Sequence, residues 1–189
     1  MRTPASLVVS IALAAATGAA VAAAGSDAAA RSSVRALALP GGTEDGITMD
    51  YVAFDPHTGS LWVPAGNTGA VDVVDTGTGT VRQIAGFPTT EVEVRGRKRL
   101  VGPSSAAIGD GRIYIGNRGD STVCAVDAQS LQRGPCGHLD AMPDGLIYVA
   151  SEKEVWVTTP RDNSVRILDA ATLAQKARLG RGLDPSGQN

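Results

Sequence analysis

The polar side chains that could take part in binding or catalysis are few and widely spaced in this sequence. Asp50, the pair Ser104-Ser105 and Asp144 each come just before one of three similar segments. Two such carboxylates could supply oxygen ligands to a divalent cation, although the middle position offers serine instead of a carboxylate. Arg118 and Arg161 lie in turns of the second and third segments. The candidate ligand-binding residues are therefore Asp50, Ser104, Ser105, Arg118, Asp144 and Arg161.

A second candidate site is a run of basic residues. Residues 95–99 read RGRKR and carry four positive charges, on Arg95, Arg97, Lys98 and Arg99. Such a run is usual at the solvated tip of a hairpin, and it could also contact an anionic partner. The formal net charge of −2 is too balanced for a general attraction to nucleic acid or to a membrane surface. We expect no nucleic-acid partner.

Other signatures of catalysis are missing from the sequence. It has no G-x-S-x-G elbow, no H-E-x-x-H pair and no phosphate-binding loop, and its two histidines, His57 and His138, are far apart. Cys124 and Cys136 flank a turn near Ser130, which suits a cross-strand disulfide better than a zinc site with four ligands. We expect no catalytic residue, metal or cofactor.

The elements that must position these side chains repeat along the chain. The stretches LWVPAGNTGAVDVVD (61–75), IYIGNRGDSTVCAVD (113–127) and VWVTTPRDNSVRILD (155–169) can be superimposed. In each, an aromatic residue is followed thirteen positions later by an aspartate: Trp62 and Asp75, Tyr114 and Asp127, Trp156 and Asp169. The copies lie 52 and 42 residues apart, spacings typical of repeated supersecondary units.

The pattern between these landmarks predicts an all-β protein. Short apolar runs alternate with turn residues every 6–12 positions, without a helical period. We predict four antiparallel strands per repeat, the arrangement of a β-propeller blade, with blades at about 49–86, 102–139 and 143–180. A hairpin insertion is expected at 89–101, where Glu91 or Glu93 could pair with Arg99. One leading strand is expected near 34–39, so three blades and this strand form an incomplete ring within a domain at 31–189.

The landmark residues themselves have structural explanations. The aromatic residues are expected to pack between blades, and the aspartates to accept backbone N–H bonds in the turn that follows. In a blade, the turns between the second and third strands and the links between blades open on one face. We call this the loop face, and it should carry the candidate residues and the basic hairpin.

The repeats resemble the YVTN-type β-propeller repeat of YncE-like bacterial proteins. The resemblance is carried by VWVTTPRDNSVRILDAATL (155–173) and IYIGNRGDSTVCAVDAQSL (113–131), and the first copy departs from it at Gly69. It implies a seven-bladed, exported protein that binds a ligand without a known activity. We therefore interpret the chain as a non-catalytic binding or scaffold protein, whose partner is a small molecule or protein on the loop face. The alternative is a hydrolase of the propeller-lactonase kind, with a divalent metal held at the channel mouth by Asp50 and Asp144.

The first thirty residues have the composition of a signal peptide. Arg2 is followed by an alanine-rich apolar stretch at 7–24 and by small residues suited to cleavage at 22–24 or 28–30. We expect a periplasmic or secreted protein, which meets a membrane only through an uncleaved signal segment. Exposed apolar faces on the end blades should favour self-association.

Overall fold

The structure is a computed structural model that describes residues 34–44 and 46–180. The expected signal peptide at 1–30 lies outside these residues. The chain divides into two units, Met1–Ala36 and Leu37–Asn189, and the second unit contains all the sheets. Within the described ranges, no helix is long and apolar enough to cross a membrane.

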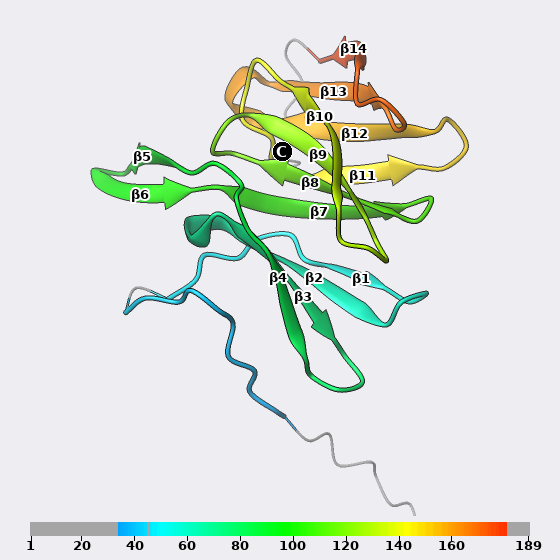
Figure 1. The fold of residues 1–189 in the computed structure, drawn as a ribbon. Helices are drawn as coiled ribbons and strands as arrows, with labels where there is room; N and C mark the ends of the chain where they lie inside the picture. Colours follow the sequence, from blue (N-terminus) through cyan, green and yellow to red (C-terminus); the bar gives the residue numbers. More distant parts are fainter. Residues whose placement is uncertain (1–33, 45, 181–189) are drawn as a thin grey trace, which may run out of the picture. The chain divides into compact units, whose positions relative to one another are not determined.

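The second unit contains three four-stranded antiparallel sheets, in each of which consecutive strands are paired (Figure 1). The first sheet consists of β1 (Ala53–Asp55), β2 (Ser60–Ala65), β3 (Ala70–Asp75) and β4 (Val81–Ile84). The second consists of β7 (Pro103–Gly109), β8 (Arg112–Asn117), β9 (Thr122–Asp127) and β10 (Arg133–His138). The third consists of β11 (Leu146–Val149), β12 (Glu154–Thr159), β13 (Ser164–Asp169) and β14 (Gln175–Leu179). The prediction of an all-β fold built from four-stranded sheets is confirmed, and the sheets do not close into a ring.

In the first two repeats, the aromatic residue faces the sheet that follows in the sequence. Trp62 is fully buried in a core cluster shared by the first and second sheets. Tyr114 is 1% exposed in a cluster shared by the second and third sheets, and its hydroxyl donates a hydrogen bond to the Ala170 carbonyl at 3.2 Å. Side chains alternate between the two faces of a strand, and the neighbours Val155 and Val157 face the second sheet. Trp156 therefore faces away from it and is only half-buried.

The aspartate that ends each repeat closes a turn. Asp75 accepts backbone N–H bonds from Gly77 and Thr78, both at 2.9 Å. The other two aspartates accept the same pair of bonds from the residues two and three positions ahead, and also a bond from the side chain of Ser130 or Thr172. These bonds lower the pKa of the three carboxyl groups. We call these residues the turn aspartates: Asp75, Asp127 and Asp169.

A separate hairpin joins the first two sheets. It consists of β5 (Thr90–Val94) and β6 (Arg97–Val101), paired so that Val92 lies opposite Arg99. This register places Arg99 on the opposite face of the hairpin from Glu91 and Glu93, so the expected pairing of Arg99 with either glutamate is wrong. Glu91 instead forms an ion pair with Lys98 at 2.8 Å, and both side chains are exposed.

Two expectations about the start of the folded region require correction. The residues at 34–39, expected to form a leading strand, have no strand conformation, and Val34 is 98% exposed. A lone strand needs a sheet edge to pair with, and no described strand pairs with this segment. The first strand was expected at 51–54 but begins at Ala53, because Tyr51 bonds the neighbouring sheet: its N–H donates to Ser104 at 3.0 Å and its carbonyl accepts from Ala106 at 3.1 Å.

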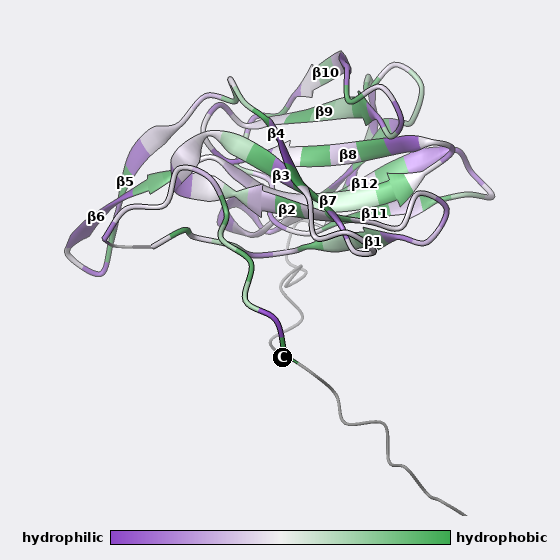
Figure 2. Cartoon of the chain, turned by 60° about the horizontal axis from the view of Figure 1, so that its bottom comes forward, coloured by the Kyte–Doolittle hydropathy of each residue, from purple (hydrophilic) through white to green (hydrophobic). Residues whose placement is uncertain are grey.

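The two cysteines form a disulfide across the edge of the second sheet. Cys124 in β9 lies directly opposite Cys136 in β10, with their Cα atoms 4.0 Å apart. The bond covalently ties the exposed outer strand β10 to the buried strand β9. Figure 2 shows that β9 and the neighbouring β8 are rich in hydrophobic residues, as expected for strands buried between sheets.

Candidate binding cavity at the loop face

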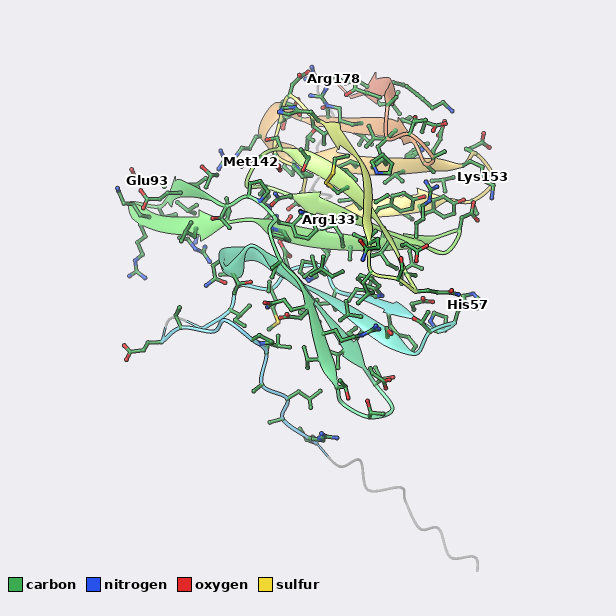
Figure 3. All side chains as sticks on the ribbon, viewed as in Figure 1. His57, Glu93, Arg133, Met142, Lys153 and Arg178 are labelled. Carbon is green, nitrogen blue, oxygen red and sulfur yellow. A yellow bond between two sulfur atoms is a disulfide. The ribbon has the colours of Figure 1, made fainter. Side chains whose placement is uncertain are left out.

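A cavity of about 450 Å³ lies where the turns, the links between sheets and the hairpin meet. The links contribute residues 48–50, 102–104 and 142–144, and the turns contribute Gly66, Arg118 and Arg161. The hairpin adds residues from both of its strands. In Figure 3, Glu93 on the hairpin and Met142 lie toward one end of the sheets, whereas His57 and Lys153 lie in turns at the other end. The cavity therefore belongs to the loop face.

Arg118 is the central polar group of this cavity. Its Nη2 donates to Asp50 at 3.0 Å and to Asp144, and its Nε donates to the Pro143 carbonyl at 3.3 Å. The arginine belongs to the second sheet's turn, and the two aspartates lie in the links that lead to the first and third sheets. One guanidinium group thus joins all three repeats, with a side chain that is 28% exposed.

These contacts change the interpretation of the two carboxylates. Asp50 and Asp144 were the proposed ligands of a divalent metal, but both are ion-paired with Arg118. Among the described residues, no group of three or more histidines, cysteines or acidic residues could hold a metal ion. The charge of Asp144, partial burial and the charge of Asp50 together raise the pKa of the nearby Tyr51 hydroxyl. The local chemistry is that of a guanidinium clamp.

Ser104 and Ser105, near the start of β7, lie in different environments. Ser104 lines the cavity but is 5% exposed, and its hydroxyl makes a long 3.5 Å bond to the Gly116 carbonyl. Ser105 is completely buried, does not line the cavity, and its Oγ has no hydrogen-bond partner among the described residues. Of the six candidate ligand-binding residues, all except Ser105 meet at this cavity.

Two arginines at the cavity have no charge partner. Arg99 and Arg161 line it, both residues are exposed, and within the described ranges neither side chain makes a hydrogen bond or an ion pair. The remaining basic residues of the hairpin (Arg95, Arg97 and Lys98) line an adjoining recess together with Asn67 and Thr43. The cationic groups of the basic run are therefore divided between two neighbouring hollows, and only Arg99 reaches both.

The turn that carries Arg161 is held by its neighbour Asp162. That carboxylate accepts bonds from the hydroxyls of Thr159 at 2.7 Å and Ser164 at 2.8 Å, and ion pairs from Arg166 and Arg178. Burial alone would raise the pKa of Asp162, but these donors outweigh it and lower the pKa to about 2. These contacts fix the backbone of the turn, and with it the position of Arg161 at the cavity.

The first link is fixed against the cavity by Asn67. The Asn67 side chain accepts a bond from the Thr48 N–H at 2.9 Å, donates to the Gly46 carbonyl at 3.0 Å, and its backbone N–H donates to Thr48 Oγ1. The backbones of Gly66 and Gly102 also approach closely, since a Cβ atom on Gly102 would lie 2.4 Å from the Gly66 carbonyl oxygen. Glycine at 102 is therefore required for the link to pass this turn.

Sequence reasoning missed the apolar part of the cavity wall. Met49, Met142 and three residues of the hairpin line it: Val92 and Val94 from one face of the hairpin, and Leu100, which the register places on the other face. The alternation of Val92 and Val94 with glutamates was a usable signal, because an apolar face on a projecting hairpin needs something to cover it. Nothing comparable marked the two methionines, which lie in links without periodicity.

Comparisons with known proteins agree on the fold. No protein-family profile and no curated protein sequence matches this chain. Among solved structures, it is similar to Kuenenia stuttgartiensis hydrazine synthase, with 18% identity, a TM-score of 0.60, and coverage of 77% of this chain and 40% of that chain. It is also similar to virginiamycin B lyase from Staphylococcus aureus, with 13% identity, a TM-score of 0.59, and coverage of 79% and 45%. The WD40 repeats of RRP9 match with 15% identity, a TM-score of 0.52, and coverage of 73% and 40%.

These similarities establish a fold of the β-propeller type. The chain spans less than half the length of each of these solved chains. Because the sequence identities are below 20%, these similarities carry no information on ligand or activity.

Proposed function

We propose that this chain is a binding module built from YVTN-type β-propeller repeats, and that its ligand binds in the loop-face cavity. The observation that carries the proposal is the convergence of three links, three turns and the hairpin on one cavity of about 450 Å³. This volume falls in the range of about 300–1,000 Å³ that small-molecule sites occupy. Its apolar wall and small number of fixed polar groups also fit a binding site.

A binding role is better supported than a metal-dependent hydrolase. The hydrolase alternative needs Asp50 and Asp144 as metal ligands, and their ion pairs with Arg118 supply a positive charge where the cation would sit. A catalytic site also needs a nucleophile or a proton donor, and of the two serines at the middle link, one is almost completely buried and the other lies outside the cavity. The clamp instead serves to hold the cavity in shape.

The proposal can be tested with a fragment library that contains anionic, neutral and cationic compounds. Backbone NMR shifts should change first at the links, at Arg118 and on the hairpin when a fragment binds. The variant Met49→Trp, at a cavity-lining residue that is 56% exposed, should fill the cavity and abolish these changes. A matched control is Val52→Trp, since Val52 is similarly exposed at 48% but lies outside the cavity wall. Fragments that bind only elsewhere would refute the proposal.

We also propose that the protein is exported to the periplasm or secreted. The support is the alanine-rich apolar stretch at 7–24 after Arg2, together with a disulfide of the kind that persists in oxidising compartments. N-terminal sequencing of the protein from the periplasm or medium should find a new terminus after residue 24 or 30. A chain retained in the cytoplasm with its first residues intact would contradict export.

Self-association through the third sheet is a further part of this proposal. The face that carries Trp156 also exposes Ile147 at 60% and Leu179 at 43%. In the other two repeats the corresponding face is covered by the next sheet, so a second copy of the chain is the proposed occupant here. Sedimentation velocity should detect association that rises with concentration and that Ile147→Lys weakens. A monomer at all concentrations would exclude it.

A further inference from the structure

We propose that the loop-face cavity selects a small amphiphilic carboxylate, a molecule with an aliphatic body and one carboxylate head. This inference rests on the proposed binding function and assigns its ligand class. Three features carry it: the charge balance of the wall, the unused donors of its arginines, and the chemistry of its apolar side.

The charge balance favours an anion. The cavity wall contains two carboxylates, Asp50 and Asp144, and three guanidinium groups, those of Arg99, Arg118 and Arg161. Arg118 engages both carboxylates, and the three guanidinium groups together exceed the two carboxylates by one positive charge. Three more cations of the hairpin lie around the adjoining recess, against one carboxylate, Glu91. Positive charges thus outnumber negative charges at both hollows, which favours an anionic ligand.

The unused donors favour a carboxylate head. Arg118 donates from Nε and Nη2, whereas its Nη1 makes no hydrogen bond to any described residue. The whole guanidinium groups of Arg99 and Arg161 are equally free within the described part of the chain. A planar carboxylate matches the fork of a guanidinium group and can accept two parallel bonds from it. The two free arginines provide that fork, and Asp50 and Asp144 keep Arg118 oriented beside it.

The apolar side of the cavity favours a ligand that has an aliphatic chain in addition to its charged group. Val92, Val94 and Leu100 of the hairpin lie across the cavity wall together with Met49 and Met142. These side chains are aliphatic or thioether groups without a polar atom that could bind a sugar or a nucleobase. Methionine adapts its shape to flexible apolar partners. A short inorganic anion would leave this wall in contact with water, whereas an aliphatic chain would cover it.

The first test measures four probes on the full-length chain by isothermal titration calorimetry. Octanoate has both the head and the body, acetate lacks the body, octanol lacks the charge, and octylammonium reverses it. Octanoate should bind at least tenfold more tightly than the other three, and its affinity should fall as salt is raised, since exposed charges are screened over about 8–10 Å. Equal binding of octanoate and octanol would overturn the inference, and so would binding to anionic lipid vesicles without binding to octanoate.

The second test uses variants. Arg99→Gln and Arg161→Gln should each weaken octanoate binding about tenfold, the effect of losing one charge-assisted hydrogen bond. Arg82→Gln removes a similar exposed charge from β4, outside the cavity, and should have no effect. All three positions are exposed, so the variants should keep the wild-type melting temperature. If all three variants bind octanoate like the wild type, the assignment of the head group to these arginines is wrong.

The outcomes separate this inference from the function on which it rests. Neutral or cationic fragments that bind in the cavity, while octanoate does not, would overturn the carboxylate assignment and leave the binding function in place. If Met49→Trp leaves octanoate binding unchanged, the octanoate site lies elsewhere and the inference fails. If no compound of the fragment library or the probe set binds at the cavity, both proposals fail.

Discussion

Replacement of Arg118 by glutamine should destabilise all three repeats together. The side chain links the second sheet's turn to Asp50 and Asp144, which precede the first and third sheets. Its loss removes three contacts and leaves two carboxylates near each other without a compensating cation. The effect on unfolding should therefore exceed that of an ordinary surface arginine.

The size of the effect follows from the exposure of each partner. The Asp50 side chain is 42% exposed, so its pair with Arg118 should contribute only about 0.5–1 kcal/mol. Asp144 is 21% exposed, and a charge-assisted bond in that environment contributes about 1–2 kcal/mol. The bond to the Pro143 carbonyl adds about 0.5 kcal/mol. The expected loss is about 2–3.5 kcal/mol, or a melting temperature lower by about 4–14 °C.

Urea denaturation followed by circular dichroism measures this loss, with Arg82→Gln as the control for removal of a surface charge. A double-mutant cycle with Asp144→Asn should give a coupling energy of about 1–2 kcal/mol between the two residues. The transition should remain single in the wild type and separate into steps in Arg118→Gln, if the clamp couples the repeats. A loss below about 0.5 kcal/mol, or one equal to that of the control, would refute the reasoning.

Three further predictions concern stability. Replacing Cys124 and Cys136 together by alanine should lower the free energy of unfolding by about 3 kcal/mol, because the disulfide closes a loop with a sequence separation of 12. A wild-type protein with the same denaturation midpoint under reducing and oxidising conditions would contradict this. The turn aspartates have lowered pKa values in the folded state. Their contribution to stability should be complete above the unfolded pKa of about 3.9 and should disappear as the pH falls through the lower pKa values of the folded state. The stability of the triple Asp→Asn variant should therefore decrease less steeply below pH 5 than that of the wild type. An equally steep loss in that variant would exclude them as the cause. Asp162→Asn should lower the free energy of unfolding by about 2–3 kcal/mol, because the Arg166 side chain is 0% exposed and would keep only one ion-pair partner, Asp140 at 3.5 Å, beside neutral bonds to Ser164 and Gln175. A cost below about 1 kcal/mol would show that these remaining partners replace Asp162.

The fold could be predicted from the sequence because its determinants are local and repeated. The thirteen-residue spacing from aromatic residue to aspartate fixes a strand, a turn and a second strand in each copy. The aspartate bonds only residues two and three positions ahead, so its role follows from sequence distance alone. The expectation at 34–39 failed because a strand depends on a partner, and an apolar pattern does not say whether a sheet edge is present.

The site was predictable in its location but not in its contacts. The blade geometry placed Asp50, Arg118 and Asp144 near one another. It could not indicate that Arg118 would pair with residues 68 and 26 positions away, since such pairs depend on the relative placement of different sheets. Likewise, Arg99 and Glu91 were close in sequence, but a hairpin register in which Val92 faces Arg99 directs them to opposite faces.

The direction in which the aromatic residues point affects how the number of repeats can change during evolution. The second repeat carries both halves of an interface: an aromatic side that covers the third sheet, and an aliphatic side that receives Trp62 of the first. A gene segment encoding about one repeat can therefore be duplicated in tandem, and the new copy finds a matching surface on both neighbours without a compensating mutation.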